Sequence, residues 1–146
     1  MRLILLSTLA IVVTCSPGPK KAIAQAPSQT TLWAGIGVRQ PLFRVHETEK
    51  LSVSFIVVND MQTEVNPRIE SSHLFINGRE PTDWAIVIGN GLRSSYFRAL
   101  PTGEVLSFSY ELGPRYFSKP GIYTLRWQSA DFRSSPVTFR VLPDGI

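Results

Sequence analysis

The stretch that decides the fold class is Leu51-Ser-Val-Ser-Phe-Ile-Val-Val58. Leu51, Val53, Phe55 and Val57 occupy every second position, and Ser52 and Ser54 lie between the first three of them. This period of two puts apolar side chains on one face of an extended chain and polar side chains on the other, which is typical of a half-buried β-strand. The Asn59-Asp60 pair that follows predicts the end of the strand.

Other stretches repeat this pattern along the chain. Strong alternation is present at Leu106 to Leu112, Tyr123 to Gln128 and Val137 to Val141, and weaker strands are predicted at Leu32 to Val38, Leu42 to His46, Ile69 to Ile76 and Trp84 to Ile88. Gln40-Pro41 divides the first two weaker strands, because proline has no N–H to donate to a ladder. A division of this kind is common where a chain crosses between two sheets.

Turn signals separate these strands, and no helix is expected. Asn77-Gly78 and Asn90-Gly91 are typical of tight hairpin turns that need positive φ. No window of a dozen residues keeps apolar positions at helical spacing. Short strands separated by turns, each with one polar face, therefore predict an all-β protein with an antiparallel β-sandwich of seven to nine strands.

The chain has 146 residues, of which 43% are hydrophobic and 18% charged. This composition does not fit a disordered chain, and the length fits one domain. The expected organisation is an export signal over residues 1–24, a flexible leader over 25–31 and the sandwich over 32–146.

The first residues are typical of an export signal. Arg2 precedes an apolar run from Leu3 to Val13, which is too short to span a bilayer. In one interpretation Ala22 and Ala24 form the cleavage site and the mature chain starts at Gln25. The protein would then be periplasmic or secreted.

In a second interpretation Cys15 is the lipidated first residue of a bacterial lipoprotein, and the signal covers residues 1–14. Val12-Val13-Thr14-Cys15 resembles a lipobox, although Thr14 stands where a smaller residue is usual. The protein would then be anchored to the cell envelope only by that lipid. The two interpretations remain open.

Charge and cysteine content narrow the classes of partner. The whole chain carries +4, but residues 1–24 hold three basic and no acidic residues, which leaves twelve Lys and Arg against eleven Asp and Glu. A net charge of +1 does not predict binding to nucleic acid. Cys15 is the single cysteine, so the sandwich has no disulfide and no thiolate metal site.

The C-terminal third carries a resemblance to a known fold family. Lys119-Pro-Gly-Ile-Tyr-Thr-Leu125 resembles the tyrosine-corner segment of immunoglobulin-like (Ig-like) sandwiches, and Leu125 stands where antibody domains have a disulfide cysteine. Leu100-Pro-Thr-Gly-Glu104 resembles a turn of exported bacterial Ig-like modules, with Thr102 and Gly103 displaced by one. The resemblance covers residues 100–142 and implies an Ig-like sandwich of bacterial type.

The chain is also similar to the Ig-like domain of bacterial intracellular proteinase inhibitors, although an export signal conflicts with that location. Such sandwiches serve many roles, so the fold alone does not assign a function.

Catalytic and metal-binding patterns are not found in the sequence. His46 and His73 are the only histidines, no Gly-x-Ser-x-Gly elbow is present, and the acidic residues are scattered. Zinc needs three or four close ligands, which two distant histidines do not supply. Neither an enzyme nor a bound cofactor or metal is therefore expected.

The best candidates for contact with a partner lie between Trp84 and Arg98. Trp84, Arg93, Tyr96 and Arg98 are residue types that dominate protein interfaces. The sequence therefore predicts a non-catalytic cell-envelope or secreted module that binds a protein or a surface partner through loops or by strand addition at a sheet edge. The alternative is a secreted protease inhibitor that acts through a protruding loop.

Overall fold

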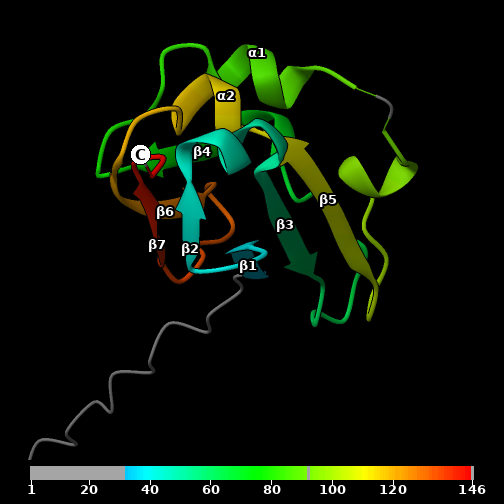
Figure 1. The fold of residues 1–146 in the computed structure, drawn as a ribbon. Coiled ribbons are helices and arrows are strands. Elements are labelled where there is room, and N and C mark those ends of the chain that lie inside the picture. The colour runs from blue at the N-terminus through cyan, green and yellow to red at the C-terminus, as the bar shows by residue number, and fades with distance from the viewer. Residues whose placement is uncertain (1–31, 92, 146) are drawn as a thin grey trace, which may run out of the picture.

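The computed structural model describes residues 32–91 and 93–145, and most of the regular structure is β-strand in two sheets (Figure 1). The predicted export signal, the Cys15 lipidation site and the leader 25–31 lie outside these residues. One sheet has the order β1-β3-β5 and the other the order β2-β7-β6-β4. The strands are β1 Trp33–Val38, β2 Leu42–Arg44, β3 Ser52–Val58, β4 His73–Ile76, β5 Val105–Glu111, β6 Gly121–Gln128 and β7 Val137–Leu142. The all-β prediction is confirmed at this level.

The core lies between the two sheets because alternate residues of each strand point inward. In β3, Val53, Phe55 and Val57 are fully buried, and the residues between them are not. Phe55 joins the two layers: its ring lies 5.2 Å from that of Phe108 in its own sheet and 5.1 Å from that of Trp127 in the other. The alternation read from the sequence therefore places the core correctly.

The first strand crosses between the sheets at the predicted division. β1 pairs antiparallel with β3, whereas β2 pairs parallel with β7. The turn between them contains Pro41, whose carbonyl accepts a hydrogen bond from the Arg140 N–H at 2.9 Å. All other strand pairs among the described residues are antiparallel.

The predicted strand at Trp84 to Ile88 is wrong, because these residues form helix α1, Trp84–Gly89. Trp84 and Ile88 are buried, whereas the three residues between them are exposed or partly exposed. Two buried residues four positions apart lie on the same face of a helix. A continuous apolar run has no periodicity that separates helix from strand, and strand was the wrong choice. The expectation of no helix is also wrong, since α2 covers Gly113–Tyr116 and three 3₁₀ turns are η1 Val45–Lys50, η2 Ile69–Ser71 and η3 Ser95–Phe97.

Two weaker strands are shorter than predicted. The strand that starts at Leu42 ends at Arg44, where η1 begins, and Ile69 starts η2 rather than a strand. In the remaining strand β4, Leu74 is buried and His73 is exposed. This settles which face of that segment points into the core.

One of the two predicted hairpin turns is present. Asn77 and Gly78 have φ of 49° and 79°, and Ile76 bridges to Arg79 across the turn. The second prediction is wrong, because Asn90 has φ of −97° and follows the last residue of α1. Gly91 alone takes positive φ there.

Candidate functional site

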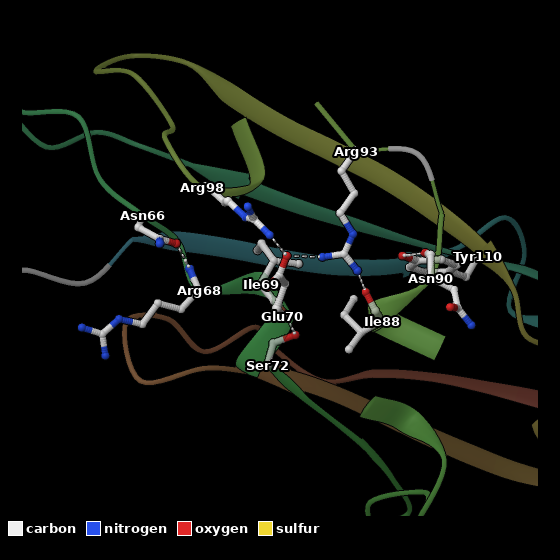
Figure 2. Close-up of polar contacts among 10 residues, drawn as sticks. All are labelled: Asn66, Arg68, Ile69, Glu70, Ser72, Ile88, Asn90, Arg93, Arg98 and Tyr110. Carbon is white, nitrogen blue, oxygen red and sulfur yellow. Dashed lines mark hydrogen bonds and ion pairs between the residues drawn. The ribbon is translucent and has the colours of Figure 1, made fainter. Parts of the chain in front are cut away.

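Two of the four predicted contact residues, Arg93 and Arg98, meet at the carboxylate of Glu70. Glu70, on η2, lies between two guanidinium groups, 2.8 Å from Nη1 of Arg93 and 3.3 Å from Nη2 of Arg98 (Figure 2). We call Glu70, Arg93 and Arg98 the arginine–glutamate cluster. These three residues come from two segments, one before β4 and one before β5, that the fold brings together.

The two arginines of the cluster differ in exposure and in role. Arg93 has only 16% of its side chain exposed, donates a second hydrogen bond to the Ile88 carbonyl and lies over the Phe97 ring at 5.2 Å. It therefore ties the segment after α1 to η2 and to the core. Arg98 is 77% exposed, so its ion pair with Glu70 is weak and its guanidinium faces solvent.

The other two predicted contact residues do not join this cluster. Trp84 is 1% exposed, and its indole N–H donates to the Ser72 carbonyl at 2.8 Å. Tyr96 is partly buried against the core. The four residues therefore do not form one surface, and Arg98 is the only one that presents most of its side chain to solvent.

Each histidine pairs with one carboxylate on the surface. Nδ1 of His46 lies 2.6 Å from Oδ1 of Asp144, and Nδ1 of His73 lies 2.8 Å from Oε1 of Glu80. The backbone N–H of His46 also donates to Asp144, and this hydrogen bond, with that of the ring, holds the pKa of the carboxyl below its usual value. The imidazoles are 64% and 52% exposed, so both pairs are open to water.

The described residues contain neither a cluster of metal ligands nor a helix suited to span a membrane. It contains no group of three or more His, Cys, Asp or Glu placed to hold a metal ion. None of its helices has the length and apolar content that crossing a membrane requires.

A second surface, which the sequence did not indicate as a site, lies on the outer side of the β1-β3-β5 sheet. Its residues alternate with the buried ones along each strand, and they are small apart from one aromatic and one aliphatic side chain. They are Trp33, Gly35 and Gly37 of β1, Ser54 and Ile56 of β3, and Ser107 and Ser109 of β5. We call this set the serine–glycine face.

The serine–glycine face is hollow and carries an exposed indole. The hollow measures about 700 Å³, and Trp33 is 56% exposed at one end of it. A Cβ at Gly35 would lie 3.1 Å from Cη2 of Trp33, so the indole leans over this glycine rather than standing away from the sheet. At the other end, the hydroxyl oxygens of Ser54 and Ser109 lie 2.9 Å apart.

The outer faces of the two sheets differ in charge. No residue that lines the serine–glycine hollow is charged. On the β2-β7-β6-β4 sheet, a smaller hollow of about 390 Å³ is lined in part by Arg126 and Arg133. The sequence contains one indication of the serine–glycine face: Trp33, Gly35 and Gly37 lie on the same side of a predicted strand.

Comparisons with known proteins do not assign this chain to a family. A scan against protein-family models, a search of curated proteins and a search of solved structures each found no match.

Proposed function

We propose that this chain is an exported, non-catalytic binding module built on an Ig-like sandwich, and that it contacts a component of the cell envelope through the serine–glycine face. The export signal and the alternative lipid anchor at Cys15 argue for this location, as set out from the sequence.

The Ig-like part of the proposal is supported by one hydrogen bond and by the strand order. The Tyr123 hydroxyl donates to the Lys119 carbonyl at 2.8 Å, which is the contact of a tyrosine corner. The first strand divides between the two sheets, and its second half runs parallel to the last strand. In the segment Leu100 to Glu104, which resembles a turn of exported bacterial modules, Gly103 has φ of 78°, a conformation that glycine favours.

The absence of a catalytic role is supported by the surroundings of the histidines. Among residues 32–91 and 93–145, neither imidazole is hydrogen-bonded to a serine or threonine hydroxyl. Each contacts only a carboxylate at the open surface, where water screens the pair. In nucleophilic catalysis, by contrast, the base is hydrogen-bonded to the hydroxyl or thiol that it activates.

The observation that carries the binding role is the exposure of Trp33 beside the hollow. Tryptophan, with tyrosine and arginine, is enriched among the residues that dominate binding energy. The other two tryptophans, Trp84 and Trp127, are 1% and 0% exposed. Of the three tryptophans, only Trp33 is therefore exposed enough to contact a partner.

The test is retention of the full, naturally processed chain on envelope fragments from the cells that produce it. We expect Trp33→Ala to weaken retention at least tenfold, because it removes the exposed ring from the hollow. Ile122→Ala is the matched control, since Ile122 is 62% exposed on β6, outside this face.

The control should bind like the natural chain. If the natural chain is not retained, or if both variants are retained equally well, the proposed role of this face is wrong.

A further inference from the structure

We propose that the serine–glycine face binds an uncharged saccharide of the cell envelope. This inference rests on the proposed function and names the chemistry of its partner.

A sugar ring has an apolar side formed by C–H groups and an edge of hydroxyls that donate and accept hydrogen bonds. A site for it therefore needs an exposed aromatic ring next to small polar groups, over a floor without bulky side chains. Serine hydroxyls suit this purpose because each is one donor and two acceptors. Apolar lining with a few placed polar groups is the general pattern of small-ligand sites.

The strand register sets these groups out in rows across the serine–glycine face. Trp33 aligns with Val58 and Val105 at one end of the sheet. The next row on the same side is Gly35, Ile56 and Ser107, and the third row is Gly37, Ser54 and Ser109. Along the strand direction, the outward side chains of the face thus change from aromatic and aliphatic ones to serine hydroxyls.

The dimensions of the face leave room for a short saccharide between the Trp33 backbone and the serines. Successive rows on one side of a sheet are two residues apart, or about 7 Å. The backbone of Trp33 and the Ser54–Ser109 pair are thus separated by about 13 Å along the sheet, and the indole covers part of this distance because it leans over Gly35. A short oligosaccharide can then stack one ring on Trp33 and place the hydroxyls of another against the serines.

Glycine keeps this hollow open. Nothing lies within 4 Å of a Cβ built at Gly37, whereas a Cβ at Gly35 would meet the Trp33 indole at 3.1 Å, so the open floor position of β1 is Gly37. A side chain in this position would fill space that is now available to a ligand. Because glycine weakens a strand, Gly37 is a cost to stability that open space for a ligand would explain, while Gly35 makes room for the Trp33 ring.

The charge of the lining favours a neutral ligand over an anionic one. No arginine or lysine lines the serine–glycine hollow, whereas Arg126 and Arg133 line the hollow on the other sheet. A protein partner is less favoured, because Ile56 is the one large outward side chain between Trp33 and the serines. The other large residues of the lining, Ile36, Phe55 and Phe108, belong to the inward face. Protein interfaces instead place several large anchors together at their centre.

The experiment is titration of the full, naturally processed chain with neutral oligosaccharides, using β-linked oligomers of glucose, of N-acetylglucosamine and of mannose. Binding is read from tryptophan fluorescence and from calorimetry. Because Trp84 and Trp127 are buried, a change in quenching by a soluble quencher reports on Trp33. We expect at least one oligomer to bind and to protect Trp33 from the quencher.

Three variants separate the saccharide site from effects on folding. Trp33→Ala should weaken binding at least tenfold and Ser109→Ala about threefold to tenfold. Gly37→Val should abolish binding with the fold intact, since it adds a side chain to open space in the hollow. Ile122→Ala should leave the affinity unchanged.

The envelope experiment distinguishes failure of this inference from failure of the proposed function. If retention on envelope fragments survives periodate oxidation of glycans but is lost after protease treatment, the partner is a protein and the saccharide inference is overturned while the binding role stands. Binding of charged saccharides alone, or full binding by Gly37→Val, also overturns it. Loss of retention after periodate oxidation, with competition by a neutral oligomer, supports it.

Discussion

Ser72 shows at the scale of one residue how polar atoms are accommodated in this core. Its hydroxyl accepts the Trp127 indole N–H at 2.9 Å and donates to the Ile69 carbonyl at 2.6 Å. Its own carbonyl accepts the Trp84 indole N–H at 2.8 Å. Both tryptophans are thereby satisfied, and no buried side-chain polar atom is left without a partner among the described residues.

Replacing Ser72 by alanine should lower the free energy of unfolding by more than the loss of one small side chain suggests. Ser72→Ala leaves the Trp127 indole N–H buried without an acceptor, which costs about 1–3 kcal/mol of the free energy of unfolding. Urea unfolding of the full chain measures this difference. Ser118→Ala is the control, because Ser118 is exposed. Equal stability of the two variants would show that another group accepts the indole hydrogen bond.

At the scale of elements, η1 and α2 approach each other so closely that only glycine fits at the crossing. A Cβ at Gly113 would lie 1.6 Å from the carbonyl oxygen of Thr48 and 2.9 Å from Cβ of Leu51. Since the nearest atom belongs to the backbone, it has little freedom to move aside. Gly113 also donates its N–H to the Leu51 carbonyl at 3.1 Å.

Gly113→Ala should therefore destabilise the fold by about 3 kcal/mol or more, since the two backbones must separate. Gly89→Ala is the matched control, because Gly89 is in α1 and nothing lies within 4 Å of its Cβ position. The control should be neutral or slightly stabilising, as alanine favours helix. Thermal unfolding of both variants measures the contrast, and similar midpoints would contradict the close crossing.

The start of α1 is joined to α2 by a carboxylate, and the two helices lie side by side in Figure 1. The Tyr116 hydroxyl donates to Asp83 at 2.8 Å, and Arg115 pairs with the other carboxylate oxygen. The Tyr116 hydrogen bond and the Arg115 guanidinium hold the pKa of Asp83 below its ordinary value of 3.8. Burial, together with Asp83, raises the pKa of Tyr116, so this phenol remains a donor.

This linkage predicts a pH dependence of stability. A carboxyl with a lowered pKa in the folded state stabilises the fold above its unfolded pKa, near 3.8, and loses this contribution as the pH falls through its folded pKa. Asp83→Asn should therefore be less stable than the natural chain at pH 7, and the difference should shrink at pH values below about 4. Urea midpoints at pH 7 and pH 3 measure this, and a difference that does not change with pH would contradict it.

At the scale of the whole molecule, the sequence leaves open two forms of the protein in the cell. The intact mass of the natively expressed protein, measured in separate membrane and soluble fractions, distinguishes them. A soluble chain that starts at Gln25 would mean a free exported domain. A membrane-bound chain that starts at Cys15 with added acyl groups would mean a tethered lipoprotein. A mass that includes the residues from Met1 would contradict export by either route.

The parts of the fold predicted from sequence are those with an unambiguous period. β3, β5, β6 and β7 each alternate buried and outward side chains within one strand, and all four were located within about two residues. α1 was misassigned because all residues from Trp84 to Ile88 are apolar, so no period separates helix from strand, although Asp83 before them is a residue type that favours a helix start.

The candidate sites were harder to predict than the strands. Trp84 was proposed as a contact because of its residue type, but its position on the helix and its bond to Ser72 bury it. The Arg93–Glu70 pair joins residues 23 positions apart, and no local pattern indicates such a pair. The serine–glycine face requires the pairing of three strands before its residues become neighbours.

The sequence by itself determined the all-β class, the division of the first strand and the inward face of the strongest strands, because each of these follows from local periodicity and from proline chemistry. The tertiary structure decided which strands pair, which tryptophan is exposed and where the hollow lies. Pairing between distant strands sets these features, and Trp33 shares one face with Ser54 and Ser109 only through the β1-β3-β5 order.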